Sequence, residues 1–410
     1  MIRTAADIRR LNSFAVVRSI HASGGATRRE LAEFAGLSFA TVAVICTDLL
    51  DRGILVEVAK SRAAAGRPTA KLSLDPDHGY LLGVDIAETY VHVEALDASL
   101  ELISSTRHEI DFHKRRPREV VEGVTSAIAE ERAKHTGRRL LGVGVSAPGQ
   151  VDQVGGTSVF APNWDWHNVP LLDMISKEID APLFLDNPLK SLAIAEMWLQ
   201  PERRRQNFIV LNLGTGVGAG VAIDGQVLRG RTNSAGEWGH SVLVADGRPC
   251  RCGSRGCVEA YVGAPGILQT LSESHPESDL LHGDDQTATV RAIATAAELR
   301  DPVALDVIEQ TSHYLGIAIA SAINLLNPDA VILGGWVAAE LGTELLEKSR
   351  AHIRTHALAV PMMAASFELQ DPRGNSVSLG VAAFALERYL DSIPDSPAES
   401  TPVVQTRQLG

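Results

Sequence analysis

The sequence has no apolar run that approaches the ~18 residues a membrane-spanning helix needs, and its longest apolar stretches, such as residues 317–323, are short. It also begins without the apolar segment of a signal peptide. We therefore expect a cytoplasmic protein with no membrane partner. Net positive charge is lacking too: the formal net charge is −12, which argues against a chain that coats nucleic acid with its whole surface.

Extremes of composition are absent, since 45% of the residues are hydrophobic and 21% are charged. These fractions exclude a wholly disordered chain, a collagen-like chain and a small disulfide scaffold. The length of 410 residues exceeds one ordinary domain and predicts two or three.

Cysteine is scarce, and three of the four cysteines lie within eight residues, at Cys250, Cys252 and Cys257. In a reducing compartment such a cluster indicates metal or redox chemistry rather than a disulfide framework. His240 precedes it and completes the spacing H-x9-C-x-C-x4-C. Three thiolates and one imidazole suit tetrahedral zinc in a structural site. Free or redox-active thiols are the alternative interpretation.

The charge is unevenly distributed along the chain. Residues 1–75 hold 11 Lys and Arg against 7 Asp and Glu, whereas the remainder holds 27 against 43. A basic segment ahead of an acidic body is typical of a nucleic-acid-binding head. A chance fluctuation in a short window would give the same balance.

The N-terminal 75 residues carry the pattern of three helices. Apolar residues recur at helical spacing over residues 7–22. Thr27 and Glu30 form a capping-box pattern ahead of a short second helix that ends at Gly36. Ser38 is placed to cap a third helix, which would be the recognition helix of a helix-turn-helix.

Two predicted strands, residues 54–58 and 70–74, follow the helices and flank the basic loop SRAAAGRPT. We therefore predict a winged helix-turn-helix over residues 1–75 that binds a double-stranded DNA operator. A helical oligomerisation or peptide-binding module on the same scaffold is the alternative. Arg67 in the wing would enter a narrow minor groove. The candidate DNA-contacting residues are Thr27, Arg28, Arg29, Ser38, Phe39, Thr41 and Arg67.

The rest of the chain contains the same strand pattern twice. An apolar strand over residues 80–86 ends in a polar turn and is followed by further strands, and the same opening recurs at residues 208–223. This recurrence predicts two related α/β halves with a cleft between them, residues 76–200 and residues 201–390. The tail, residues 391–410, is rich in Pro, Ser and Thr, and we expect it to be disordered.

Four segments carry a family resemblance: LGTGVGAG at residues 213–220, AGEWGH at 235–240, CRCGSRGCVE at 250–259 and NPDAVILGG at 327–335. In this order they resemble the ROK family of transcriptional regulators and sugar kinases. The resemblance implies an actin-like, ribonuclease-H-like ATPase-type fold for the α/β body in two halves. It also implies the N-terminal, mainly α, winged helix-turn-helix of the regulator branch, and a homodimer or homotetramer.

The same resemblance implies a structural zinc ion and a sugar pocket. The zinc motif of the family matches at His240, Cys250, Cys252 and Cys257. We expect the zinc to hold a loop that brings two carboxylates to the cleft, and Trp164 and Trp166 to offer a flat apolar wall. A sugar or sugar-phosphate effector would be held by Gly149, Asn163, Asn187, Glu237, His240 and Glu259.

Two departures from the family pattern argue against kinase activity. The position of the catalytic base is Pro188, which cannot take a proton, and Asp186 is displaced by two residues. The first phosphate loop of the family, Asp-x-Gly-Gly-Thr-Lys, reads Asp-Ile-Ala-Glu-Thr-Tyr at residues 85–90. We therefore predict a sugar-responsive regulator, with no catalytic residues. An ATP-dependent sugar kinase with a DNA-binding head and a regulator controlled by a protein partner remain as alternatives.

Overall fold

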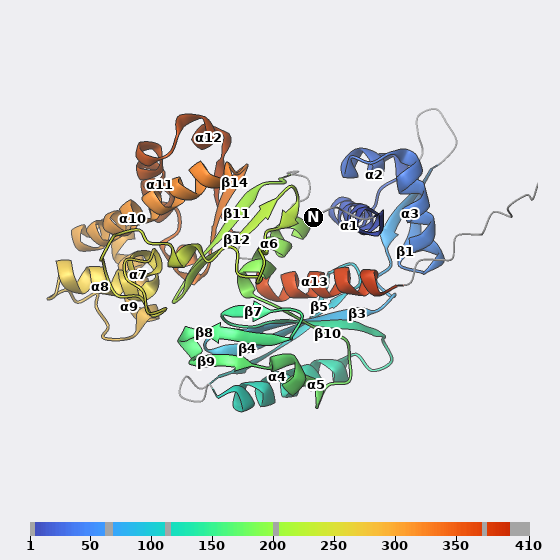
Figure 1. Ribbon diagram of the computed structural model, residues 1–410, viewed down its shortest axis with the longest axis horizontal. Coiled ribbons are helices and arrows are strands. Elements are labelled where there is room, and N and C mark those ends of the chain that lie inside the picture. Colours follow the sequence, from blue (N-terminus) through green and yellow to red (C-terminus); the bar gives the residue numbers. More distant parts are fainter. Residues whose placement is uncertain (1–4, 62–68, 111–115, 200–204, 371–374, 394–410) are drawn as a thin grey trace, which may run out of the picture.

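A computed structural model describes residues 5–61, 69–110, 116–199, 205–370 and 375–393. Figure 1 shows three parts: a small N-terminal head, a lobe built on one sheet, and a second lobe rich in helices. The head contains the predicted helices and hairpin: α1 (Ala5–Ser23), α2 (Arg28–Ala35), α3 (Phe39–Asp51) and the antiparallel strands β1 (Leu55–Ser61) and β2 (Thr69–Leu74). The loop between these strands, and with it Arg67, lies outside the described residues.

Local signals in the head sequence give the helix boundaries. The backbone N–H of Thr27 donates to Glu30 Oε2 at 2.7 Å, and that of Glu30 donates to Thr27 Oγ1 at 3.3 Å, so the predicted capping box forms. Gly36 ends α2 with a φ of +67°. Helices α2 and α3 are bent by 116° relative to each other.

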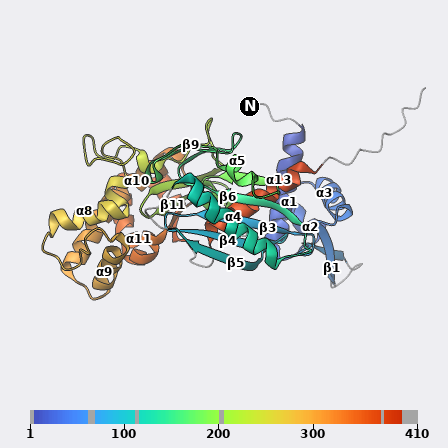
Figure 2. The ribbon, with the colours of Figure 1, turned by 90° about the horizontal axis from the view of Figure 1, so that it is seen from below.

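The first lobe is a five-stranded sheet of order β10-β6-β3-β4-β5. Helix α13 (Ser376–Ser392) covers one face, and α4 (Pro117–Lys134) and α5 (Leu171–Ser176) lie on the other (Figures 1 and 2). The strands are β3 (Tyr80–Ile86), β4 (Tyr90–Asp97), β5 (Leu102–Glu109), β6 (Leu140–Ser146) and β10 (Leu183–Asp186). A small sheet joins them, with β7 (Gln150–Asp152), β8 (Thr157–Ala161), η1 (Pro162–Trp164) and β9 (Trp166–Val169).

The second lobe repeats this strand arrangement. Its sheet has the order β13-β12-β11-β14-β15, again three antiparallel strands followed by two parallel ones. The strands are β11 (Phe208–Leu213), β12 (Val217–Ile223), β13 (Gln226–Val227), β14 (Ala330–Gly334) and β15 (Ser366–Leu369). The helices are α6 (Pro188–Leu199), η3 (Trp238–His240), α7 (Glu259–Val262), α8 (Ala264–Ser274), α9 (Gln286–Glu298), α10 (Pro302–Leu326), α11 (Trp336–His356) and α12 (Ala359–Ala364).

Helices α6 and α13 join the two lobes at close range. A Cβ on Gly144 of β6 would overlap with the carbonyl oxygen of Val381 in α13. A Cβ on Gly380 of α13 would likewise overlap with the carbonyl oxygen of Ser191 in α6. Sheet, α13 and α6 therefore touch backbone to backbone, which only glycine permits. The contact leaves little room for one layer to slide independently of the next.

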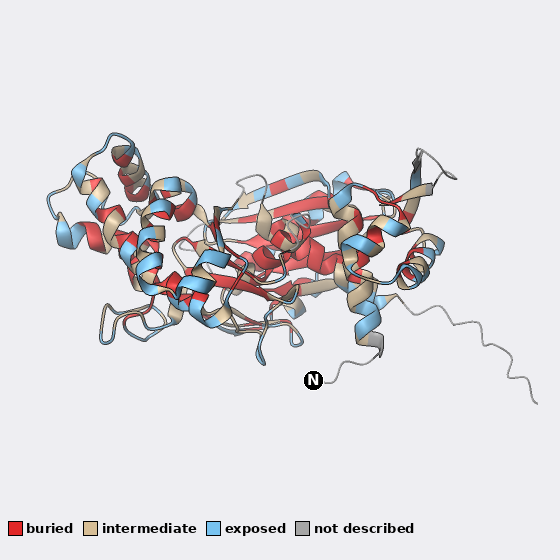
Figure 3. Cartoon of the chain, turned by 90° about the horizontal axis from the view of Figure 1, so that it is seen from above, coloured by how far each residue is buried: buried red, intermediate tan, exposed pale blue. Residues whose placement is uncertain are grey.

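The head shares a hydrophobic core with the body. One buried cluster runs from Val17 and Ile20 of α1 to Trp198 of α6 and Phe384 of α13. Figure 3 shows buried segments continuing from the central sheets toward the head. In the described part of the chain, no single helix is long and apolar enough to cross a membrane, although the bent pair α2 and α3 passes that test together.

Candidate ligand cleft and metal cluster

A cavity of about 1180 Å³ is lined by residues of both lobes. Its walls come from the carboxyl ends of β3, β6, β11 and β14 and from the loops that follow them. The carboxyl ends of parallel strands are where open α/β sheets bind their ligands. All six predicted effector contacts line this cavity: Gly149, Asn163, Asn187, Glu237, His240 and Glu259.

Asn163 and Glu259 face the same glycine in the cavity. A Cβ on Gly216 would lie 3.5 Å from Asn163 Nδ2 and 3.6 Å from Glu259 Oε2. Asn163 Nδ2 also donates to Glu88 Oε1 at 2.9 Å, a contact that the sequence did not suggest. The backbone N–H of Val217 donates to Glu259 Oε2 at 2.9 Å and fixes that carboxylate.

Asn187 links the cavity to the start of α6. Its Nδ2 donates to the carbonyl oxygen of Gly149 at 2.7 Å. Its Oδ1 accepts from the backbone N–H groups of Leu189 at 2.8 Å and Lys190 at 3.3 Å. Asn187 therefore acts as the N-terminal cap of α6 while it lines the cavity.

A buried lysine lies beneath the cavity. Lys190 is fully buried and its Nζ donates to the carbonyl oxygen of Ala235. Burial lowers the pKa of Lys190, although the charges of Glu237 and Asp186 oppose this effect. Burial raises the pKa of Glu237, which the charges of His240 and Lys190 partly offset. The sequence signal for Lys190 was a lysine within the otherwise apolar helix of residues 188–199.

Asp186, the carboxylate displaced from the family's base position, is already engaged. It is fully buried, and Arg229 Nη1 donates to its Oδ2 at 2.7 Å. Asn233 Nδ2 and the backbone N–H of Asn187 donate to its Oδ1 at 3.2 and 2.8 Å. Among the described residues, the cavity wall includes Pro188 but not Asp186.

The side chains of the altered phosphate loop contact one another and Asn375 at the start of α13. Tyr90, at the family's lysine position, donates its hydroxyl to Asp85 Oδ2 at 3.4 Å. Asn375 Nδ2 donates to the same oxygen at 3.0 Å, and burial raises the pKa of Asp85 to about 6. The Arg107 guanidinium lies 3.9 Å from the centroid of the Tyr90 ring.

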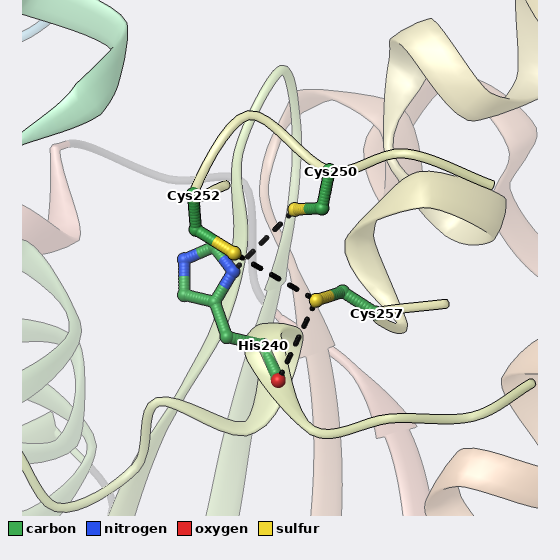
Figure 4. A group of neighbouring side chains, drawn as sticks. All are labelled: His240, Cys250, Cys252 and Cys257. Carbon is green, nitrogen blue, oxygen red and sulfur yellow. Dashed lines mark hydrogen bonds between the residues drawn. The ribbon is translucent and has the colours of Figure 1, made fainter. Parts of the chain in front are cut away.

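The predicted metal ligands converge. The ligand atoms of His240, Cys250, Cys252 and Cys257 all lie within 4.8 Å of one another (Figure 4). Cys252 Sγ and Cys257 Sγ are 3.8 Å apart, and Cys250 Sγ is 3.7 Å from His240 Nδ1. Tetrahedral zinc with Zn–S bonds of ~2.3 Å places two ligands about 3.8 Å apart, so the donor set fits this metal.

The metal cluster adjoins the cavity. Cys250 Sγ lies 3.7 Å from Glu259 Oε1, and His240 lines the cavity itself. The two predicted tryptophans differ in position. Trp164 lines the cavity although it is also buried in the core of the first lobe, whereas Trp166 is 2% exposed, packs in the same core and is not among the lining residues. The prediction that both rings form a sugar-facing wall is wrong for Trp166, because its apolar surface is used in the core.

The structure exposes three of the six described DNA-binding candidates, Arg29, Ser38 and Phe39. Ser38 and Phe39 begin α3 at the surface, and Ser38 Oγ lies 2.8 Å from Thr41 Oγ1. Arg29 is exposed and pairs loosely with Glu33 at 3.7 Å, while Arg28 is half-buried. Thr27 is buried and its hydroxyl belongs to the capping box, so its side chain is not presented at the surface.

Residues 81–388 match the model of the ROK family. The chain is 27% identical over 394 residues to a protein named putative xylose repressor from Caldicellulosiruptor sp. strain Rt8B.4, covering 95% of this chain and 98% of that protein. A solved ROK family transcriptional regulator, described as a homolog of the E. coli MLC protein, has a TM-score of 0.77 at 26% identity, covering 94% of this chain and 98% of the other.

A solved ROK family glucokinase from Streptomyces griseus, in complex with glucose and AMPPNP, has a TM-score of 0.65 at 28% identity. That match covers 99% of the glucokinase but 75% of this chain, whereas the regulator is matched along almost the whole of both chains. The ROK family model matches residues 81–388, which are most of the chain and include the residues that line the cleft. The chain therefore belongs to the ROK family.

Proposed function

We propose that this protein is a DNA-binding transcriptional regulator, of the repressor type, that senses a sugar in a cleft related to that of sugar kinases. The observation that carries this proposal is the match to a ROK regulator over 94% of the chain, head included. The ROK glucokinase is matched over its whole length and leaves a quarter of this chain unaccounted for.

The head is a winged helix-turn-helix in this proposal. The 116° angle between α2 and α3 is within the range of ~90–120° typical of that motif. Ser38, Phe39 and Thr41 at the start of α3 would meet base edges in the major groove, and Arg28 and Arg29 would contact phosphates. Two heads of a homodimer or homotetramer would bind half-sites that are a helical turn apart.

The cleft binds the effector through its carboxylates and amides. Glu237 and Glu259 offer acceptors to neighbouring sugar hydroxyls, and Asn163 and Asn187 offer amides. His240 turns its Nδ1 toward Cys250, and its Nε2 serves the sugar. A zinc ion held by His240, Cys250, Cys252 and Cys257 would cross-link the loops that present these groups, as a structural site does.

Phosphoryl transfer is absent in this account. Pro188 supplies no base, and Asp186 is buried against Arg229 and Asn233. The turn that would cradle phosphates carries a carboxylate, Glu88, in place of glycine. Positioning and neutralising the phosphates is most of what such an enzyme must do.

Helix α6 connects the sugar to the DNA-binding head. Asn187 caps it in the cleft, and its 12 residues span about 18 Å toward the head. Near its end, the Trp198 ring lies 5.5 Å from the His21 ring of α1. Arg18 of α1 donates to Met197 Sδ at 3.5 Å. A sugar that moves Asn187 would therefore move the residues of α6 on which α1 packs. It changes operator binding only if it binds two arrangements of the head with different affinity.

The test is operator binding by the full-length protein. We expect its own upstream DNA to bind tightly at low salt, and one sugar of a panel to change that affinity at least about tenfold. Asn187→Ala should lose the response to the sugar. Affinity for DNA that no compound changes, or ATP-dependent phosphorylation of a sugar, would overturn the proposal.

A further inference from the structure

We propose that Glu88 restricts the cleft to uncharged sugars, by excluding phosphate groups and by holding Asn163 in place. This inference rests on the proposed function, since it concerns the class of effector that the same cleft accepts. It makes Glu88 the residue that decides between a free sugar and its phosphate ester.

The geometry places Glu88 in the cavity wall, in contact with Asn163. It lies on the turn between β3 and β4, whereas Asn163 lies on η1 after β8. Both residues line the cavity, and the 2.9 Å bond from Asn163 Nδ2 to Glu88 Oε1 joins them. The bond fixes the orientation of the amide, because only its NH₂ group can donate to a carboxylate.

The surrounding charges favour neutral ligands. Among the described residues that line the cavity, the carboxylates outnumber the guanidinium groups, and lysine does not occur. The carboxyl groups are Asp85, Glu88, Glu94, Glu237, Glu259 and Glu340, and the guanidinium groups are Arg107 and Arg291. Burial raises the pKa of Asp85 and of Glu94, so these two carry less negative charge than the others, and the carboxylates still outnumber the guanidinium groups without them.

Both guanidinium groups are already paired. Arg107 Nε donates to Glu109 Oε1 at 2.9 Å while the group stacks on Tyr90. Arg291 Nε donates to Glu340 Oε1 at 2.8 Å. The buried Lys190 does not supply a cation either, because its Nζ donates to Ala235 beneath the wall. A phosphate ester beside Glu88 would thus meet a carboxylate, while the guanidinium groups of the wall are engaged with Glu109 and Glu340.

The expected loss of affinity for the ester follows from placing two negative charges in contact in a partly desolvated site. Placing a phosphate dianion beside a carboxylate costs enough to lower affinity by about 100-fold or more. A hydroxyl at the same place can instead donate a hydrogen bond to Glu88. The cleft should therefore prefer a sugar to its ester by at least that factor.

The experiment measures binding of matched pairs to the full-length protein by calorimetry. The probes are glucose, xylose and N-acetylglucosamine, each with its phosphate ester. Glu88→Gln removes the charge but keeps an oxygen that can accept from Asn163, and Glu88→Ala removes both. Glu178→Gln, an exposed carboxylate on the first lobe outside the cavity wall, is the control for net charge.

For the wild type we expect one neutral sugar to bind about 100-fold or more above its ester. Glu88→Gln should reduce this ratio at least about tenfold, and Glu88→Ala should also weaken the neutral sugar. Glu178→Gln should leave the ratio as it is.

Two results would overturn the role of Glu88 while leaving sugar sensing intact. One is a wild type that binds the ester as well as the sugar, and the other is a ratio that Glu88→Gln does not change. A wild type and variants that bind neither member of any pair would overturn sugar sensing itself, and the role of Glu88 with it.

Discussion

The indole of Trp198 lies 5.5 Å, centroid to centroid, from the imidazole of His21, in an edge-on arrangement. Trp198 is fully buried near the end of α6, and its Nε1 donates to Glu387 Oε1 at 3.3 Å. His21 is also held by the body, because its Nδ1 lies 2.7 Å from the carbonyl oxygen of Ser99. The first helix of the head is thereby anchored to the helix that Asn187 caps in the cleft.

From this contact we predict that a substitution at His21 keeps effector binding but weakens the effect of the effector on operator affinity. His21→Ala should still bind the effector and the operator, because His21 lies outside the cleft wall and outside α3. The ratio of operator affinities with and without effector should fall at least about threefold, since the edge-on contact with Trp198 is lost. Fluorescence anisotropy with labelled operator measures this ratio. His167→Ala, an exposed histidine on β9, is the control, and a full response in His21→Ala would contradict the coupling through α6.

Glu94 predicts a pH dependence of stability. Glu94 is 5% exposed, and burial raises its pKa to about 7 from the ordinary 4.5. The folded state thus holds a proton that the unfolded state releases, so this group lowers stability as the pH rises from about 4.5 to 7. Glu94→Gln should match the wild type near pH 4.5 and exceed its free energy of unfolding by about 3 kcal/mol at pH 8.

Urea unfolding at several pH values measures that difference. Glu178→Gln, at an exposed carboxylate, should track the wild type throughout. A difference between Glu94→Gln and the wild type that stays constant from pH 4.5 to 8 would show that folding does not raise the pKa of Glu94.

The metal cluster predicts one zinc ion per chain. Cys252→Ser should purify with little zinc and a lower melting temperature, because the cross-link between the cleft loops is lost. Effector binding should weaken more than operator binding, since Cys250 lies beside Glu259 and far along the chain from the head. Metal analysis and calorimetry measure both. Cys46→Ala, at a buried cysteine of the head, should keep its zinc; full zinc content in Cys252→Ser would refute the assigned ligand set.

In the head, we expect the side chain of Arg29 to contact a phosphate of the DNA backbone. Its side chain is 86% exposed and its ion pair with Glu33 is loose, at 3.7 Å. Arg29→Ala should weaken binding to every DNA sequence alike and reduce the salt slope of the logarithm of affinity by about 0.9. Arg118→Ala, an exposed arginine on α4, serves as the comparison. An unchanged slope in Arg29→Ala would remove this residue from the interface.

The features that the sequence predicted correctly are local ones. The capping box at Thr27 and Glu30 and the stop at Gly36 depend on neighbours within a few residues. The predicted metal ligands Cys250, Cys252 and Cys257 lie within one short loop, so their spacing alone restricts the geometry, and the structure brings them together with His240. The six effector candidates came from family motifs, and all of them line the cavity.

The features that the sequence did not predict depend on tertiary contacts. Glu88 and Asn163 are 75 positions apart, and Asp186 and Arg229 are 43 apart, so no periodic pattern links them. The core that the head shares with α6 and α13 was missed for the same reason. Trp166 shows the reverse error, because an aromatic side chain in a loop pattern suits a ligand wall and a buried core equally well.

The most direct test of the account is the operator affinity of the full-length protein, measured with and without a saturating neutral sugar. We expect a change of at least about tenfold that Asn187→Ala abolishes, with no ATP-dependent phosphorylation of the sugar. An operator affinity that no sugar alters, together with turnover of ATP and sugar, would contradict it.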